Sequence, residues 1–520
     1  MSGKVNKVLV MLLCFVMVAA MVAGCGQKQG DGVTTENGST KAESSEKTSQ
    51  QEELIKERKL SIITTPAGAN FPDGVSIDNS KWFTFIEEKT GYDLEWTLFK
   101  KGSTVDEQLM ILLASGNAPD LIQVDGGSQV LTSIVKNGGV SAIDDAWSKY
   151  ANNLKKMVPQ EVLDIFKIDG KHWYIPRYAP VRGIGTMAVR KDWLDELGLK
   201  VPVTIDDYYN VLVQFKKAKP DMIPLIAAGK EKYSSFYRFI HLAGAFGIYS
   251  NEKLDFYFAE SGKVEFSILT EKGKSFLKTM NKWYNEGLID REYLLEKQPI
   301  EKMIAGQGGM GHWNKVEKVR QTGAFEKKNP GAELVYIAPP VGANGEQGYL
   351  QQKAKGMAFF VPQTSEKKVY AAVDFLEKCT ENGIYDAICY GFEGEHYTKN
   401  GSEIVLDEEK LTQDAYMGYY SRLTLDNSYG EVWYKIFEGG TEAVVFADSF
   451  GKDNAILMVP MTLETYNKKI SELSKFVEDS IMRFIVEGFT DVEFDKLVED
   501  FNTRGGKECA EELQKWYDSK

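Results

Sequence analysis

Two glycine-rich stretches are the segments of this 520-residue chain that come nearest to a nucleotide-binding loop. Residues 183–188 read GIGTMA, which fits GxGxxA, and residues 306–311 read GQGGMG, which fits GxGxxG. A phosphate loop needs a strand before the glycines and a helix after them, so that the helix N-terminus meets the phosphate. Both stretches instead run into strand-like sequence, MAVR and GHW. We therefore interpret them as bends or close backbone approaches beside strands.

Signatures of hydrolases are missing from the sequence, which contains no GxSxG, HExxH or GxxxxGK[ST] pattern. Its histidines stand far apart, so a metal site would have to be assembled through space: His172, His241, His312 and His396. Carboxylates are abundant, and a glycosidase pair therefore stays open, although no two carboxylates stand out. We expect a protein that is not an enzyme and that needs no cofactor or metal.

Aromatic residues are the most informative candidates for ligand contact. The chain has 9 Trp, 25 Tyr and 27 Phe, and several lie in loop-like segments beside glycine. An aromatic ring offers an apolar face to the C–H face of a sugar, while polar neighbours bind the hydroxyls. Trp313 is the strongest candidate because it follows a glycine run at an expected strand end. The other candidates, each of which could equally be a core residue, are Trp82, Trp173, Tyr178, Tyr237 and Trp433.

Cys25 is the residue whose setting points to a covalent modification. Lys4 and Lys7 precede an uncharged run from Val8 to Ala23, and the small residues Ala23 and Gly24 lead into Cys25. This pattern describes a secretory signal, and the run is shorter than the ~20 residues of a spanning helix. The stretch resembles the bacterial lipobox, which implies removal of residues 1–24 and a lipid on the Cys25 sulfur. We expect a protein anchored by lipid on the outer face of the cell membrane, with a transmembrane anchor as the alternative.

The overall composition is that of an acidic globular protein, with a net charge of −13 and 43% hydrophobic residues. This charge disfavours nucleic acid and anionic lipid surfaces, both of which attract clustered positive charge. The length is too great for one simple core and predicts two or more lobes. Cys379, Cys389 and Cys509 form an odd trio without CxxC spacing, so we expect buried thiols rather than disulfides or a zinc site.

Alternating strands and helices organise the first folded part. Residues 25–59 form a polar tether, since GDGVTTENGSTKAESSEKTSQQ holds almost nothing apolar. From Leu60 onward, KLSIIT, YDLEWTLF and PDLIQV read as strands, and helices are predicted over 82–89, 105–114 and 130–135. This alternation predicts a mostly parallel sheet with helices on both faces.

A second α/β unit is predicted from about residue 190 to residue 350. Its expected strands are 186–189, IPLIAA, KVEFSIL, GGMGHW and ELVYIAPP. Its expected helices cover 191–197, 205–218 with Thr204 as N-cap, 236–245, 271–286 and 300–305. KGMAFFVP (355–362) reads as one more strand, followed by a helix that Ser365 caps and that ends at Cys379. The chain from Leu411 onward is predicted to be mainly helical.

Several motifs together resemble one family. The lipobox, APDLI (118–122), RKDWLDELGL (190–199), GFEGEHYT (391–398) and GGKECAEELQKWYD (505–518) resemble the extracellular solute-binding proteins of family 1. The most similar group is the LipO-like lipoproteins of Gram-positive ABC sugar importers. The resemblance implies a two-lobed fold of the periplasmic-binding-protein kind (type II), with discontinuous lobes, a hinge, and ligand in the cleft between the lobes. It divides the chain into lobe 1 (60–185 and 355–425) and lobe 2 (186–354 and 426–520).

The resemblance also implies particular ligand contacts. AGQGGMGHW resembles the segment of maltose-binding protein that ends in a cleft tryptophan, which supports Trp313. PDLIQVDGG resembles a cleft-edge loop after a strand and points to Asp125. IPRYAPVRG takes the place of the first crossover between lobes and points to Tyr178 and Arg182. The run from Glu393 to Tyr397 is either a cleft loop or a structural turn, and we favour the turn.

The function that follows is capture of an oligosaccharide and its delivery to a membrane permease by a monomeric, non-enzymatic receptor. Its expected partners are a carbohydrate ligand, the permease subunits of an ABC transporter and the membrane, through the N-terminal lipid. One alternative of the same class binds another solute, such as a peptide or a polyol. The alternatives of other classes are a lipid-anchored glycan hydrolase and a sensory or adhesive lipoprotein.

Overall fold

The computed structural model describes residues 55, 58–67, 69–127, 130–178, 183, 185–228, 234–295, 299–314, 317–352, 356–381, 383–401, 403–426, 428–435 and 439–520. The predictions for Cys25 and for Arg182 lie outside these residues. For Trp433, the structure describes the backbone but not the side chain. None of the helices in the described part is both long enough and apolar enough to cross a membrane.

Five strands form the first sheet, in the order β2-β1-β3-β14-β6. They are β1 (Lys59–Thr64), β2 (Asp93–Leu98), β3 (Leu121–Asp125), β6 (Ile175–Pro176) and β14 (Met357–Phe360). β1 runs parallel to β2 and β3, whereas β14 runs antiparallel to β3 and β6. The pairing with β3 confirms that the KGMAFFVP strand returns to the first sheet.

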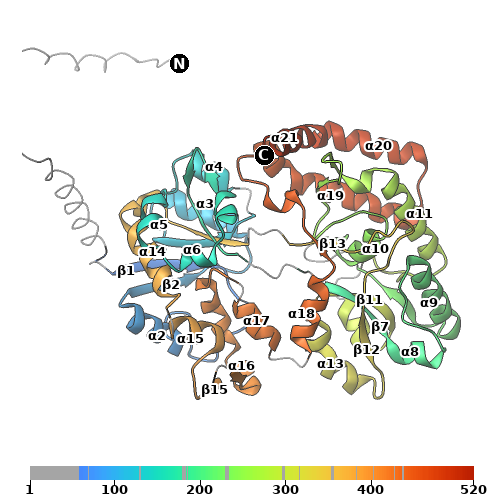
Figure 1. The fold of residues 1–520 in the computed structure, drawn as a ribbon, viewed down its shortest axis with the longest axis horizontal. Helices are drawn as coiled ribbons and strands as arrows, with labels where there is room; N and C mark the ends of the chain where they lie inside the picture. The colour runs from blue at the N-terminus through green and yellow to red at the C-terminus, as the bar shows by residue number, and fades with distance from the viewer. Residues whose placement is uncertain are drawn as a thin grey trace, which may run out of the picture. The chain divides into compact units, whose positions relative to one another are not determined.

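The helices around this sheet come from two distant stretches of the chain. The first stretch supplies α2 (Lys81–Thr90), α3 (Val105–Ser115), α4 (Leu131–Lys136), α5 (Asp144–Tyr150), α6 (Leu154–Met157) and α7 (Gln160–Asp164). The second supplies α14 (Val369–Lys378), α15 (Ile384–Tyr390), α16 (Glu408–Gln413) and α17 (Ser428–Lys435). Figure 1 shows α14 beside α5 and α6, and α5 and α14 are in contact. Apolar residues from both stretches share one core.

Smaller elements complete the first lobe. They are the hairpins β4 (Lys167–Ile168) with β5 (Lys171–His172) and β15 (Tyr397–Asn400) with β16 (Glu403–Leu406), and the 3₁₀ helices η3 (Gln363–Lys368) and η4 (Ala415–Leu423). The helix predicted from Ser365 begins later than expected. Ser365 has non-helical backbone angles within η3, and α14 starts only at Val369.

Four strands form the second sheet, in the order β12-β7-β11-β8. They are β7 (Gly185–Arg190), β8 (Ile223–Ile226), β11 (Gly308–Asn314) and β12 (Leu334–Ile337). β11 is parallel to β8 and antiparallel to β7. Because β7 and β11 begin at Gly185 and Gly308, both glycine patterns do enter strands, as the sequence indicated. KVEFSIL is mostly not a strand: only β10 (Val264–Glu265) pairs, with β9 (Tyr257–Phe258), and η2 (Ser267–Leu269) follows.

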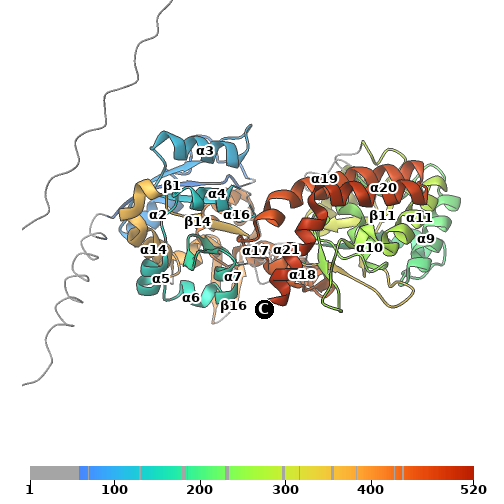
Figure 2. The ribbon, with the colours of Figure 1, turned by 90° about the horizontal axis from the view of Figure 1, so that it is seen from above.

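The second lobe is richer in helices. They are α8 (Lys191–Glu196), α9 (Ile205–Ala218), η1 (Tyr237–Phe239), α10 (Ile240–Gly244), α11 (Glu271–Asn285), α12 (Pro299–Ile304), α13 (Glu317–Lys328), α18 (Gly440–Asp448), η5 (Ala455–Met458), α19 (Glu464–Glu487), α20 (Asp491–Phe501), η6 (Asn502–Gly506) and α21 (Lys507–Asp518). Thr204 caps α9 as expected, in a capping box with Asp207. Figures 1 and 2 both show the C-terminal helices α19 and α20 beside α11, and these segments share the second core.

Three crossovers connect the two lobes, and they meet at the edge of the first sheet. The backbone N–H of Arg177 donates to the carbonyl oxygen of Met357 at 2.7 Å, and the N–H of Tyr178 donates to the oxygen of Leu425 at 2.7 Å. The Nε of Arg177 also donates to the carbonyl oxygen of Asp426 at 2.9 Å. The short pair of β13 (Tyr349–Leu350) and β17 (Gly451–Lys452) joins the start of one crossover to the segment that follows α18 in the second lobe. Side-by-side crossovers are the arrangement that a hinge requires.

Candidate ligand site

A cavity of about 390 Å³ lies at the carboxyl end of β3. Open α/β sheets place their ligands outside the carboxyl ends of strands, so the position is that of a binding site. Its lining joins the first lobe, through β3, to the second lobe, through the loop before Phe256 and the first turns of α19. The lining residues are Asp125, Gly127, Asn251, Glu252, Lys253, Leu254, Asp255, Gln352, Gly356, Tyr466, Asn467, Ile470, Ser471 and Ser474.

The first-lobe wall depends on a close approach of two backbones. The N–H of Gly126 donates to the carbonyl oxygen of Gly356 at 2.7 Å. A Cβ atom on residue 126 would stand 2.4 Å from that oxygen, so the position requires glycine. Asp125 accepts the N–H of Gly127 on Oδ1 at 2.8 Å, which fixes the carboxylate at the exposed end of the strand. The second oxygen, Oδ2, remains to bind a solute.

The second-lobe wall is held by buried hydrogen bonds. The hydroxyl of Tyr466 donates to the two carboxylate oxygens of Asp255, at 3.0 and 2.8 Å. Glu478 accepts the backbone N–H of Leu254 at 3.1 Å, and the Ser474 hydroxyl donates to the Leu254 carbonyl at 2.7 Å. Burial raises the pKa of Glu478, although the hydrogen bonds that its carboxylate accepts from the Leu254 N–H, Ser234 and Ser474 oppose the rise. The loop and α19 are therefore one fixed surface.

The crossover beside residues 353–355 is tied to the same loop. The N–H of Leu350 donates to the carbonyl oxygen of Ser250 at 3.0 Å. The amide of Gln352 donates to the carboxylate of Glu252 at 2.8 Å. Two lining residues, one in the crossover and one in the second lobe, are thus linked directly.

Most of the residues that line the cavity are polar, and the charged ones carry both signs. Asp125 of the first lobe and Lys253 and Ser471 of the second are exposed, and Ile470 is partly exposed. Carboxylate, amide and hydroxyl groups of this kind accept and donate hydrogen bonds to the hydroxyls of a polyol. Among the described lining residues, Tyr466 is the one aromatic residue, and its ring belongs to the second core. The cavity therefore offers a solute hydrogen-bonding side chains beside apolar surface, but no stacking platform among its described lining residues.

Of the sequence-predicted site residues, Asp125 lines the cavity and Trp313 does not. Trp313 is fully buried in a small cluster behind the second sheet, with Ala188, Ile226 and Met303 among its neighbours. Its Nε1 has no hydrogen-bond partner in the described part of the chain. The structure exposes no face of this ring to a solute, so stacking on a sugar stays a prediction to be tested.

The other aromatic candidates that can be placed are also packed into the cores. Trp82 is fully buried, and its Nε1 donates to the Ala387 carbonyl at 2.8 Å. Trp173 and Tyr178 are partly buried against the first core, and Tyr237 is buried in the second. These rings lie outside the cavity lining, and we leave them out of the proposed site. Sequence reasoning missed the loop 251–255 and the start of α19, since neither contains a recognisable motif.

Two of the four histidines meet inside the second lobe. The rings of His241 and His312 stack with centroids 4.7 Å apart, and their nitrogens have no hydrogen-bond partner in the described residues. Burial lowers the pKa of His241 to about 3. Burial, followed by the neighbouring His241 and Arg238, holds the pKa of His312 well below its usual value. Both rings are therefore neutral at physiological pH and act as core residues.

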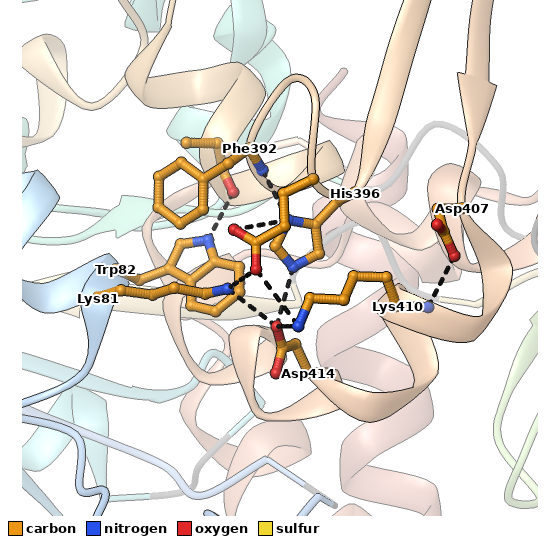
Figure 3. A network of polar contacts seen from close by, with 9 residues as sticks. Lys81, Trp82, Phe392, His396, Asp407, Lys410 and Asp414 are labelled. Atoms are coloured by element: carbon orange, nitrogen blue, oxygen red, sulfur yellow. Dashed lines mark hydrogen bonds and ion pairs between the residues drawn. The ribbon is translucent and has the colours of Figure 1, made fainter.

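A network of charged groups surrounds His396 in the first lobe (Figure 3). Lys81 Nζ lies 2.6 Å from Glu395 Oε1 and 2.9 Å from Asp414 Oδ2. Lys410 Nζ lies 3.3 and 3.2 Å from the same two carboxylates. Glu395, His396 and Asp414 are close enough to hold a cation together, but two ammonium groups already neutralise the carboxylates. The residues therefore form a network of ion pairs, which we call the His396 network.

His396 lies at the centre of this network, and each of its ring nitrogens has a hydrogen-bond partner. Nδ1 accepts the backbone N–H of Phe392 at 3.0 Å, which leaves the proton on Nε2, 3.1 Å from Asp414 Oδ2. The ring also contacts Trp82 edge-on, at 5.2 Å between centroids. The segment from Glu393 to Tyr397 is thus fastened to α2 and α16 as a turn, and it lies outside the cavity lining.

The three cysteines of the described residues are buried and free. Burial raises the pKa of the Cys509 thiol to about 12, and burial also raises the pKa of Cys379 and Cys389. Thiols in this state are protonated and unreactive, which agrees with the structural role expected for them.

Residues 68–384 match the model of one family, described as bacterial extracellular solute-binding protein. The chain belongs to this family. Its members are binding proteins, which confirms the family expected from the sequence. No other observation on the chain has to be set aside for this assignment.

Relatives and solved structures extend the same assignment. The chain is 24% identical over 449 residues to the polygalacturonan/rhamnogalacturonan-binding protein YtcQ of Bacillus subtilis, covering 82% of this chain and 86% of the relative. It is 22% identical over 468 residues to lipoprotein LipO of the same organism, covering 85% and 89%. The solved structure of the Streptococcus pneumoniae ABC-transporter substrate-binding protein FusA in complex with kestose superposes with a TM-score of 0.68 at 19% identity, covering 89% of this chain and 99% of that chain. This likeness confirms the two-lobed α/β fold.

Proposed function

We propose that this protein is the substrate-binding component of an ABC importer and captures an oligosaccharide in the cavity at the end of β3. The observation that carries the proposal is the cavity itself, which joins both lobes and the hinge and is lined by amide, hydroxyl and carboxylate groups. Closure of the lobes around a solute would then mark the loaded protein for the permease. The glycans that YtcQ and FusA bind, polygalacturonan or rhamnogalacturonan and kestose, support a glycan as the solute.

Titration calorimetry of the purified protein tests this function. The panel contains kestose and longer fructooligosaccharides, oligogalacturonides and rhamnogalacturonan fragments, with free monosaccharides for comparison. We expect saturable binding of at least one oligosaccharide at micromolar or lower Kd, with a smaller radius of gyration in solution scattering when the protein is loaded. If the whole panel leaves the protein unbound while a peptide mixture binds, the carbohydrate assignment is wrong.

A non-enzymatic role is part of the proposal. After overnight incubation with each glycan that binds, chromatography is expected to recover the glycan intact. Shorter products that disappear with an Asp125→Asn substitution would show a hydrolase instead. Size-exclusion chromatography with light scattering tests the accompanying expectation of a monomer.

One observation favours a second solute class. Asp125 and Lys253 present opposite charges to the same cavity from different lobes, a pairing that suits the amino and carboxylate ends of a peptide. A peptide is therefore the second candidate. Replacement of Lys253 by Ala would abolish the binding of a peptide. The affinity for a neutral glycan would fall only by the amount expected for the loss of one hydrogen bond.

We further propose that a lipid on Cys25 anchors the protein to the outer face of the cell membrane. The sequence from Ala23 to Cys25 and the similarity to lipoprotein LipO support this anchor. Cys25→Ser is expected to move the protein from the membrane fraction to the medium and to abolish labelling by a fatty-acid precursor. A Cys25→Ser protein that still carries the label would overturn the assignment.

A further inference from the structure

The chain makes one more connection between the lobes, just before α19. Ile456, Leu457 and Val459 belong to the second core, and so does Tyr466. Met461, between them, is 3% exposed and belongs to the first core. The sequence-based boundary assigns all of residues 426–520 to lobe 2. α17 already departs from it by packing on α15 of the first lobe, and Met461 departs as well because its side chain is buried in the first core.

Both backbone groups of Met461 are bonded to the first lobe. Its N–H donates to the carbonyl oxygen of Ile165 at 3.0 Å, and its carbonyl oxygen accepts the hydroxyl of Thr132, on α4, at 3.1 Å. One turn further along α4, Lys136 forms an ion pair with Glu464. Met461 is thus held by two hydrogen bonds and by the burial of its side chain.

The same segment is rigidly joined to the cavity wall. The side-chain amide of Asn467, a lining residue, donates to the carbonyl oxygens of Pro460 and Leu463, at 3.0 and 2.7 Å. Glu512 of α21 accepts the backbone N–H of Tyr466 at 2.7 Å. A displacement of Met461 is therefore transmitted to the first turns of α19, which line the cavity.

We propose that residues 458–464 form a cross-lobe latch, with Met461 seated in the first lobe, that keeps the cavity close to its binding geometry before a solute arrives. Without the latch, the lobes would lose one of the connections that the described residues make between them and would sample wider openings. A binding-competent state that is populated a fraction of the time weakens the apparent affinity by that fraction. The latch therefore acts as a preorganising contact whose effect does not depend on the solute.

Replacement of Met461 by Ala tests the latch in the absence of any ligand. Its matched control is Met417→Ala, which removes the same side chain from the same core, since Met417 is 1% exposed and lies within the first lobe. Donor and acceptor dyes are attached to Ile111→Cys on the first lobe and Leu295→Cys on the second, both of which are exposed positions. The latch predicts a broader distribution of transfer efficiency for Met461→Ala and an unchanged distribution for Met417→Ala.

Thr132→Val is the milder second variant, because valine keeps the shape of threonine and loses only the bond to Met461. Its control is Thr90→Val, which loses two hydrogen bonds within the first lobe, one from the Thr90 hydroxyl to the Ile86 carbonyl and one from the Tyr92 N–H to that hydroxyl. Hydrogen exchange at the Met461 amide is expected to be roughly fivefold faster in Thr132→Val and unchanged in Thr90→Val, as for the loss of one hydrogen bond.

Equal broadening in Met461→Ala and Met417→Ala would assign the effect to core stability and overturn the latch. Unchanged lobe distances in Met461→Ala, together with unchanged exchange in Thr132→Val, would overturn it as well. Because both measurements use ligand-free protein, they leave the carbohydrate assignment untouched, and failure of that assignment leaves the latch standing.

Discussion

Replacement of Trp313 by Ala distinguishes a core role from a ligand role for the residue that the sequence favoured most. The side chain is fully buried among apolar neighbours, namely Ala188, Ile226, Met303, Phe325 and Leu334. A buried tryptophan removes roughly 200 Å² of apolar surface from water, which corresponds to about 5 kcal/mol at ~25 cal/mol per Å². The unpaired Nε1 offsets about 1–3 kcal/mol of this gain. We therefore expect Trp313→Ala to lower the free energy of unfolding by about 3 kcal/mol, at the lower end of the usual range for such truncations.

Denaturant unfolding and solute titration are measured on the same preparations. Trp313→Phe is the matched variant, since it keeps an aromatic ring and removes the unpaired N–H, and its loss of stability is expected to be below about 1.5 kcal/mol. The affinity of the folded protein for its solute is expected to stay within about twofold for both variants, because Trp313 has no exposed face. A stability loss below ~1 kcal/mol in Trp313→Ala, with affinity reduced more than tenfold, would refute the core role and restore the stacking role.

Three further predictions concern other parts of the structure. Gly126→Ala places a Cβ 2.4 Å from the Gly356 oxygen, so it is expected to cost about 1–3 kcal/mol in thermal or urea unfolding and to weaken solute binding. His396 is a pH-sensitive group: burial, reinforced by Lys81 and partly offset by Asp414, lowers its pKa in the folded protein below the unfolded value of about 6.5. Protonation of His396 is therefore less favourable in the folded than in the unfolded protein. The free energy of unfolding is highest above about pH 6.5 and falls as the pH drops below it. Urea midpoints measured across this range should show the decline, and the decline should be smaller in His396→Gln. Asp125→Lys and Lys253→Asp are each expected to weaken solute binding at least fivefold, while the double exchange recovers part of the affinity if the two charges act across the cavity.

The secondary structure of the first lobe was largely readable from the sequence. The strands KLSIIT and YDLEWTLF correspond to β1 and β2, because their apolar residues fill a sheet buried by helices. In the second lobe, the helix predicted over 271–286 is α11, which ends one residue earlier than predicted. The strand predicted for KVEFSIL was mostly wrong. Alternation of apolar and polar residues over so short a run does not distinguish a strand from an extended segment before a 3₁₀ turn.

The candidate site was only partly readable, for a topological reason. Asp125 could be found because PDLIQVDGG resembles a cleft-edge loop, and the structure places Asp125 as the last residue of β3, at the strand end where such folds put their ligands. Asn251 and Tyr466 could not, since they lie more than two hundred residues apart in the chain and are brought together by contacts such as the Asp255–Tyr466 bonds. The returning segment of Met461 was hidden in the same way, because its neighbours in sequence belong to the other core.

The expectation for Trp313 arose from the glycine run before it, for which the structure gives a different physical reason. Glycine beside a strand indicates that something approaches the backbone closely, and the sequence suggested a ligand. The structure shows that core side chains make this approach: a Cβ on Gly309 would lie 2.6 Å from Phe215 and 2.9 Å from Trp193, and one on Gly308 would lie 2.1 Å from Ile226. β11 is a central strand, so both of its faces are covered by large residues, and its small residues make room for them. The tryptophan that follows is packed by the same layers, and the cavity lies elsewhere, where β3 ends and the Gly356 backbone makes a close approach.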